Sequence, residues 1–304
     1  MVHFLLTRVI QSIATVLVIS MVVFAMARAT GDPVTLLAST NASAQDIALL
    51  RQQFGLDQPL PVQYWVFLTN AVQGNLGKSL ANKQDVAQQI GERLPNSAAI
   101  GVPALLLSTI LGVAMCVAAA VKRDTWVDKS MRVVAVLGQS MPAFWVSIMA
   151  IFVFSVLLRV LPTSGMGSPD HYVLPIAVLT FFALPMRMRL MRSSLLEIMG
   201  TEYVKQARAK GLSESAVVWR HAVRNALSPQ LTSFGLTLAF AITGAVLVET
   251  VFSWPGLGQL AYQAMLSRDY PLIQGTVLLV AVLTIGANLL VDLLYAYVDP
   301  RVRY

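Results

Sequence analysis

Long apolar stretches separated by shorter polar connections form the main pattern of this chain. A membrane-spanning helix needs about 20 mostly apolar residues, and six stretches without Asp, Glu, Lys or Arg approach or exceed that length. They are residues 9–27, 94–121, 133–158, 171–186, 225–248 and 270–291. The fourth is short and contains Pro175 and Pro185. We count it as a span because apolar residues continue past Arg187, and Arg187 and Arg189 can extend to the membrane surface. The pattern predicts an all-α polytopic membrane protein with six transmembrane helices.

The composition supports a membrane protein and excludes several other classes. Of 304 residues, 56% are hydrophobic and 12% are charged, whereas an average soluble domain is roughly 25% charged. This composition argues against a soluble enzyme and against a disordered chain. The single cysteine, Cys116, excludes an internal disulfide and a cysteine-based metal site. The first apolar stretch is longer than the core of a secretory signal, so we expect a retained helix.

The basic residues are distributed unevenly between the connections. Six spans place both termini on one side of the membrane. With the termini in the cytoplasm, 15 of the 22 Lys and Arg residues lie inside and seven lie outside, as basic residues do in membrane proteins. We therefore expect a multi-pass protein of the inner (cytoplasmic) membrane with cytoplasmic termini. Residues 1–304 are expected to form one transmembrane domain, with an external segment at about 29–93 and a cytoplasmic loop at about 192–228.

The external segment at about 29–93 is polar and contains two stretches with helical character. Residues 43–54 are expected to form a helix that ends at Gly55. Residues 62–72 are expected to carry an aromatic face of Tyr64, Trp65 and Phe67. We interpret this segment as an external cap or a lateral surface element.

The cytoplasmic loop is expected to contain two short helices. Thr201 can cap the first, Gly211 stands where a glycine ends a helix, and Ser213 can begin the second. A nucleic-acid reader is disfavoured because membrane spans hold both ends of the loop. A basic loop touching lipid headgroups remains an alternative. A docking element for a cytoplasmic partner explains more, because glycine permits a sharp elbow and charges select a partner.

The same loop carries a family resemblance. The stretch from Glu202 through Gly211 to Pro229 resembles the EAA loop of ATP-binding-cassette importer permeases, with Ala207 and Gly211 as literal matches. Essentially the whole chain is similar to the B-type permease of the dipeptide, oligopeptide and nickel importer family. Asn75 departs from that family, where Asp is common. The matching stretches include RVIQSIATVLVISMVVF, LRQQFGLDQPLPVQYW, GNLGKSL, LGQSMPAFW, YVKQARAKGLS, VETVFSWPGLGQL and RDYPLIQG.

The resemblance implies a fold, a function and partners. It implies a type I importer permease fold that forms half of a translocation path and works by alternating access. The implied partners are a second homologous permease, two cytoplasmic ABC ATPases, an external solute-binding protein, the lipid bilayer and a small peptide or similar solute, with no nucleic acid. ATP and Mg²⁺ are expected on the partner subunits and no cofactor on this chain. The Gly77-Lys78-Ser79 sequence lacks the first glycine of a phosphate-binding loop, because position 72 is Val.

Two groups of residues are expected to carry the function. The ATPase-coupling loop is expected to use Glu202, Tyr203, Ala207, Arg208, Ala209, Gly211, Leu212, Ser213, Arg220 and Asn225. The external gate or binding-protein contact is expected to use Trp254, Pro255, Gly256, Gly258, Arg268, Asp269 and Tyr270. We expect no catalytic residue and no metal site.

Alternatives remain for the solute and for the class of transporter. The same architecture imports nickel chelates, glutathione or other small solutes in related systems. A different class would be an autonomous secondary carrier or channel, for which broken helices, repeats or charges at the membrane midplane would be expected. Glu249 and Asp292 are the acids nearest the span ends. We place Glu249 at the outer interface and Asp292 near the inner end of the last span.

Overall fold

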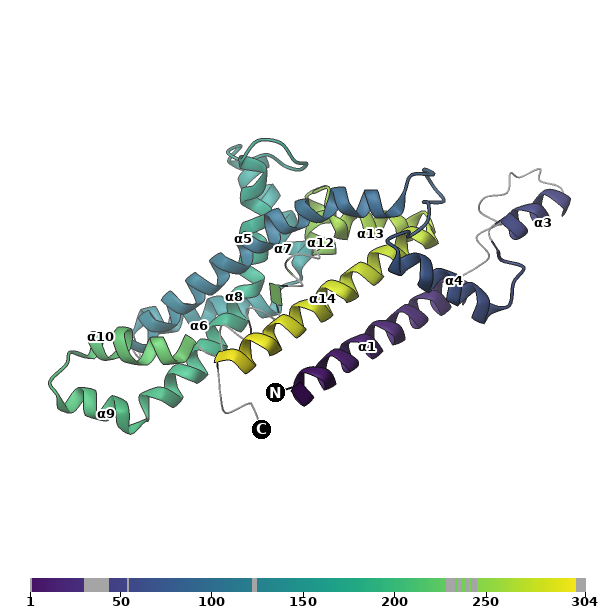
Figure 1. Ribbon diagram of the computed structural model, residues 1–304. Helices are drawn as coiled ribbons and strands as arrows, with labels where there is room; N and C mark the ends of the chain where they lie inside the picture. Colours follow the sequence, from purple (N-terminus) through teal and green to yellow (C-terminus); the bar gives the residue numbers. More distant parts are fainter. Residues whose placement is uncertain are drawn as a thin grey trace. The chain divides into compact units, whose positions relative to one another are not determined.

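The computed structural model describes residues 2–29, 44–53, 55–121, 125–227, 233, 237–238, 241 and 245–298 (Figure 1). Throughout these ranges the regular structure is helical, and the only pairing of extended backbone among them is an isolated bridge between Lys78 and Asp85. The all-α prediction is confirmed. The chain divides into two compact units, one of residues 1–96 and 256–304 and one of residues 97–255.

The first unit contains a long N-terminal helix and a long C-terminal helix that lie against each other. These are α1 (Val2–Ala29) and α14 (Tyr270–Val298) (Figure 1). The start of α5 (Val86–Val121) packs against α13 (Leu257–Leu266) and α14 through one buried cluster. The cluster consists of Val86, Ile90, Leu257, Leu260, Ala264 and Leu272. Two helices of the external segment, α3 (Ala44–Gln53) and α4 (Leu60–Val72), complete this unit.

The second unit is built around α8 (Asp170–Met199). The helices α6 (Trp126–Ser140) and α7 (Ala143–Ala150) both contact α8. Gly138 allows α6 to approach closely, because a Cβ atom there would lie 2.7 Å from Cγ of Pro185. The remaining elements are the π-helical segments η1 (Ile151–Leu157) and η2 (Val217–Ala222) and the helices α9 (Glu202–Ala209), α10 (Glu214–Ala216) and α12 (Val246–Val251).

Four described helices are long and apolar enough to cross a membrane. They are Leu6–Ala29, Val86–Ala119, Asp170–Met199 and Tyr270–Leu290, which correspond to the first, second, fourth and sixth predicted spans. The fourth extends well beyond residues 171–186, with both prolines inside one continuous helix. The fifth predicted span, 225–248, lies mostly outside the described residues.

The third predicted span, 133–158, is not one helix. Helix α6 ends at Ser140, Met141 is extended with φ −92° and ψ 137°, and α7 begins after Pro142. Proline disfavours helical backbone in the residue before it and cannot donate a helical hydrogen bond. An apolar helical stretch of 15 residues, Ala143–Leu157, follows the break.

The external segment forms the two expected helices, but its aromatic residues do not share a face. Tyr64 and Phe67 pack against Phe24 of α1, with ring centroids 5.5 Å and 5.9 Å away. Trp65 is turned away and is 64% exposed. Consecutive helical residues differ by about 100° around the axis, so Trp65 cannot lie on the side of α4 that carries Tyr64 and Phe67. The prediction of one aromatic face is therefore wrong at Trp65.

Candidate functional site

The cytoplasmic loop forms a sharp helical elbow at Gly211. Gly211 has φ +79°, and its N–H donates to the carbonyl oxygen of Arg208 at 2.9 Å. A Cβ atom at Gly211 would meet nothing within 4 Å. Glycine is therefore favoured there by the left-handed backbone conformation rather than by crowding. The prediction that Gly211 ends the first helix is confirmed.

The two predicted helix caps of the loop differ in their chemistry. The Ser213 hydroxyl oxygen accepts a hydrogen bond from the Ala216 N–H at 3.4 Å and caps α10. Thr201 occupies the N-cap position of α9, but its hydroxyl donates to the carbonyl oxygen of Ile198 at 2.7 Å and makes no capping bond. The predicted cap at Thr201 is thus correct in position but not in hydrogen bonding.

An ion pair bridges the elbow. Arg208 donates through Nε to Oε2 of Glu214 at 3.0 Å and through Nη2 to Oε1 at 2.5 Å. These hydrogen bonds lower the pKa of the Glu214 carboxyl and raise the pKa of the Arg208 guanidinium. The pair is exposed to solvent, where such pairs contribute about 0–1 kcal/mol. The pair links α10 to α9, and Glu214 is not among the residues predicted for this loop.

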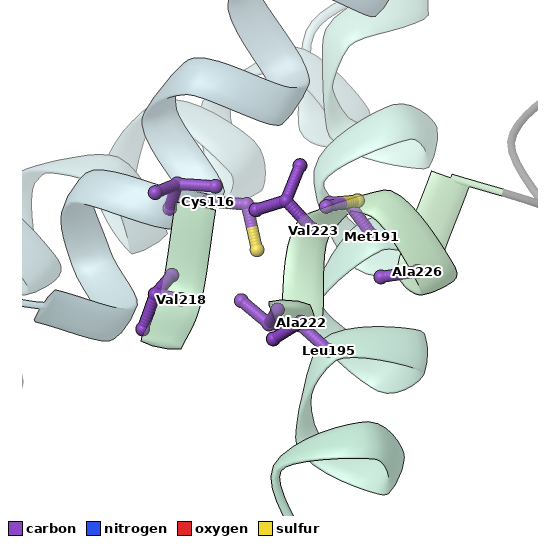
Figure 2. Packing of buried hydrophobic residues seen from close by; sticks show 8 residues of the cluster. Cys116, Met191, Leu195, Val218, Ala222, Val223 and Ala226 are labelled. Carbon is purple, nitrogen blue, oxygen red and sulfur yellow. The ribbon is translucent and has the colours of Figure 1, made fainter. Parts of the chain in front are cut away.

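The inner face of the loop is fixed to the ends of two long helices. Val204, Ala207 and Val217 form a buried cluster against Ile198 and Met199 of α8. A second cluster joins the segment 218–226 to the C-terminal parts of α5 and α8 (Figure 2). Its members are Cys116, Val117, Met191, Leu195, Val218, Ala222, Val223 and Ala226. The loop is therefore packed directly against α5 and α8, and close-packed interiors transmit displacement.

The outer face of the loop is exposed and combines apolar and basic side chains. Of the ten residues predicted for this loop, Ala207 is buried and the other nine are exposed. Tyr203, Leu212 and Trp219 are 49%, 41% and 53% exposed. Aromatic residues are enriched in protein interfaces, and Trp219 is a member of this surface that the sequence analysis missed. The signal that could have found it is an aromatic residue directly before Arg220 in this basic loop.

In the second unit, the external turn is held by buried side chains. Trp254 is fully buried, and its ring lies 4.7 Å from that of Tyr172 in an edge-to-face arrangement with an interplanar angle of 74°. Its backbone N–H donates to the carbonyl oxygen of Glu249 at 2.8 Å. Pro255, which follows, is half-buried. Trp254 therefore fixes the shape of the turn.

In the first unit, Asp269 is a buried anchor. Its Oδ1 accepts from the N–H groups of Leu80 and Leu272 at 3.1 Å and 3.3 Å. Its Oδ2 accepts from the N–H of Ala81 at 3.3 Å and from the hydroxyl of Ser79. One carboxylate thus caps the start of α14 and holds the 79–81 turn against it.

The other residues predicted around Asp269 are mostly covered. Gly256, Gly258 and Tyr270 are buried, and Arg268 is exposed with φ +52°. Gly256 is the residue before α13. Among the seven residues predicted for the external contact, Arg268 is the one whose side chain is open to solvent.

Two charged side chains in the second unit are buried where the sequence analysis expected them at a surface. Arg187 is 2% exposed and donates through Nη1 to the Ser233 hydroxyl at 2.8 Å and through Nη2 to the Thr237 hydroxyl. The prediction that Arg187 extends to the membrane surface is wrong. Glycine at 112 leaves room for the arginine, because a Cβ atom there would lie 2.8 Å from Cβ of Arg187. The signal that could have indicated its partners is the one-turn spacing of Ser233 and Thr237 in the following span.

Glu249 is the second of these buried charges. Its side chain has no exposed surface, and Oε1 accepts from the Ser97 hydroxyl at 2.7 Å. The prediction from the sequence that Glu249 lies at the outer interface is wrong, because the structure encloses its side chain. Ionisable side chains within membrane proteins face the protein interior because lipid does not solvate them.

Comparison with known proteins identifies the family. Residues 96–304 match the family described as binding-protein-dependent transport system inner membrane component, and residues 1–101 match the N-terminal family of such components. This chain belongs to that family. It is 40% identical over 305 residues to the glutathione transport system permease protein GsiC of Escherichia coli (strain K12) and to that of Salmonella typhimurium (strain LT2). It is 41% identical to the protein of the same name from Escherichia coli O6:H1, and each match covers 100% of both chains.

The family membership confirms the resemblance drawn from the sequence. The chain is a multi-pass inner-membrane permease of an ATP-binding-cassette importer, with the all-α type I permease fold. It belongs to a transport system that depends on a binding protein, and its role is that of a membrane permease rather than a catalytic enzyme.

Proposed function

We propose that this chain forms half of the translocation path of an ATP-driven importer of short peptides. The other half is a second homologous permease, two cytoplasmic ATPases bind ATP and Mg²⁺, and an external solute-binding protein delivers the solute. The observation that carries this proposal is the elbow at Gly211. Its outer face exposes Tyr203, Leu212 and Trp219 to a partner, while its inner face is fixed into α5 and α8.

The proposed transmission runs from the loop into the spans on both sides of it. When the ATPases close, they push on the loop, and the cluster around Met191 and Cys116 carries the displacement into α8 and α5. Arg187 of α8 holds Ser233 and Thr237, which belong to the span that follows the loop. The segments before and after the loop are therefore tied together and move as a pair during alternating access.

The proposed solute is a short peptide, and glutathione is the first candidate. The full-length relatives at 40% identity are named for glutathione transport, and glutathione is itself a tripeptide. A permease pathway for a tripeptide also suits the dipeptide and oligopeptide resemblance of the chain. On the external side, we propose that Arg268 contributes the exposed charge that contacts the binding protein, with Trp254 and Asp269 supporting the turns from inside.

Co-purification and transport together test this function. The tagged chain is purified in mild detergent, and the associated proteins are identified by mass spectrometry. We expect a second six-span permease and ATPases that carry a phosphate-binding loop. The complex is then reconstituted in vesicles with the binding protein, where labelled glutathione and labelled dipeptides are expected to enter only when ATP is present. A chain that purifies alone and moves solute without ATP would instead be a carrier or channel.

A further inference from the structure

Helix α4 of the external segment has an apolar outward face. Its sequence, LPVQYWVFLTNAV, contains no charged residue. Val62, Trp65, Val66 and Val72 are 44%, 64%, 51% and 82% exposed. The polar residue on the same face is Thr69, and its hydroxyl donates to the carbonyl oxygens of Trp65 and Val66, each at 3.0 Å. The outward face therefore presents a hydroxyl that is already bonded within the helix, surrounded by hydrocarbon.

The inner face of α4 places the helix at membrane depth. The Tyr64 hydroxyl donates to the carbonyl oxygen of Leu17 at 3.3 Å and shares a 2.9 Å hydrogen bond with the Ser20 hydroxyl. The apolar part of α1 is the 24-residue stretch Leu6–Ala29, and Leu17 stands at its middle. At 1.5 Å per residue, Leu17 lies about 18 Å from the outer end of α1. The hydrocarbon core of a bilayer is about 30 Å thick, so Tyr64 reaches the level of the bilayer centre.

The polar side chains of this region gather at one edge of the outward face of α4. A cavity of about 220 Å³ is lined by Arg28, at the outer end of α1, by the amide side chains of Gln58, Gln63, Asn70 and Gln274, and by Val62 and Val66 at that edge. Arg28 lies over the Phe24 ring, with Cζ 5.3 Å from the ring centroid. Polar groups thus collect near the outer end of α1, at the level expected of lipid headgroups, while the outward face of α4 has none that needs water.

We propose that α4 lies in the outer leaflet of the membrane and that Val62, Trp65, Val66 and Val72 contact lipid acyl chains. A helix satisfies its own backbone hydrogen bonds, so it can occupy hydrocarbon without penalty from the backbone. An uncharged face of this kind matches lipid rather than water. The neighbouring α3 differs, because its ten residues include Asp46 and Arg51. The proposal depends on α1 crossing the membrane and not on the identity of the solute.

Fluorescence quenching tests the proposal in the complete complex reconstituted in vesicles. The signal of Trp65 is obtained as the difference between the unaltered chain and Trp65→Phe, which retains an aromatic ring. We expect phospholipids brominated on their acyl chains to quench this difference and aqueous iodide to leave it unchanged. The matched control is Trp219→Phe, since Trp219 is similarly exposed in the chain but lies in the cytoplasmic loop. Its difference signal should not respond to brominated lipid.

A second measurement uses a nitroxide spin label and does not depend on tryptophan. Cys116 is buried, so Val72→Cys introduces an accessible thiol for labelling. A spin label at position 72 is expected to collide more often with oxygen than with a water-soluble nickel complex. The same result is expected for a label at Val18→Cys, in the middle of α1. The reverse is expected at Gln88→Cys, on the exposed polar start of α5.

Two quenching results would contradict the proposal, and they can be told apart. Quenching of Trp65 by iodide without quenching by brominated lipid would place α4 in the external water and overturn the proposal. The absence of quenching by either agent would mean that another subunit covers α4, which also overturns it. ATP-dependent uptake is measured in the same vesicles, so a loss of transport is recognised separately from the position of α4.

Discussion

Asp269 is a buried carboxylate with four hydrogen-bond donors from two parts of the first unit. The donors are the N–H groups of Leu80, Ala81 and Leu272 and the hydroxyl of Ser79. Buried charges are tolerated where such donors compensate for lost hydration. The buried Arg187 guanidinium is compensated in the same way, because it donates to the hydroxyl oxygens of Ser233 and Thr237. Because each charge holds a pair of segments together, removing it should loosen those segments rather than remove a surface contact.

Replacement of Asp269 by asparagine should therefore destabilise the first unit. The amide retains one oxygen but turns an NH₂ group toward backbone donors, so at least one of the three N–H groups that Asp269 binds loses its acceptor. We expect a loss of roughly 2–4 kcal/mol, seen as a lower thermal transition of the purified complex. The control is Asp85→Asn, because Asp85 is exposed and caps α5 through a single bond to the Gln88 N–H at 3.1 Å. Equal stability of the two variants would show that Asp269 is not an anchor.

At the scale of elements, the cytoplasmic loop combines a closely packed inner face with a glycine elbow. The hydrophobic clusters fix α9 and the segment 217–226 to α8 and α5. The Arg208–Glu214 pair bridges the elbow on the outside. Since hydrogen bonding lowers the pKa of Glu214, the pair persists at neutral pH and is lost as the pH falls through that lowered value. The left-handed backbone at Gly211 and this ion pair therefore both contribute to the angle between α9 and α10.

Gly211→Val is expected to separate coupling from assembly. A β-branched residue at φ +79° costs about 1–2 kcal/mol in backbone strain, and the elbow relieves that strain by changing its angle. Nothing within 4 Å would clash with the added Cβ atom, so the chain should still assemble with its ATPases. ATP-dependent uptake should be largely lost, while co-purification of the ATPases is retained.

The control for this variant is Gly200→Ala, at a glycine of the same loop that directly follows α8. Gly200 has an ordinary φ of −82°, and its added Cβ atom would make a normal 3.4 Å contact with the Glu197 carbonyl oxygen. Uptake should remain near its original rate. Normal uptake by Gly211→Val would show that the angle of the elbow does not matter for coupling.

At the scale of the whole molecule, the chain is a multi-pass permease, and its charges predict its orientation. The cytoplasmic loop at about 192–228 contains six of the basic residues assigned to the inside, namely Arg192, Lys205, Arg208, Lys210, Arg220 and Arg224. The family membership establishes the inner membrane, and the charge bias predicts which side the loop faces. An exposed docking face for ATPases requires that same side.

We therefore expect both termini to lie in the cytoplasm. Green fluorescent protein fused to the C-terminus should fluoresce, because it folds in the cytoplasm but not after export through the general secretory route. A thiol at Gln88→Cys should react with a membrane-impermeant reagent added from outside, whereas Leu212→Cys should react only in opened cells. Labelling of Leu212→Cys from outside would invert the topology and contradict the proposed ATPase contact.

Much of this protein could be predicted from one sequence because its strongest signals are local. The lengths of apolar stretches determined four of the long helices, and the Gly211 and Ser213 pattern determined the elbow and its cap, since each depends on residues within a few positions. Family motifs spread along the chain determined the class of transporter. The break at Pro142 was also a local signal, but the apolar composition on both sides concealed it.

The tertiary structure decided which charged and aromatic residues face inward. Arg187 reaches hydroxyls 46 and 50 positions away, and Asp269 binds a turn about 190 positions away. Tyr64 reaches a carbonyl 47 positions away. A charge beside an apolar stretch is compatible with either the membrane surface or a buried network, and an aromatic residue is compatible with either face of a helix. The choice depends on donors, acceptors and space supplied by distant segments, as at Gly112, and those meet only when the chain is folded.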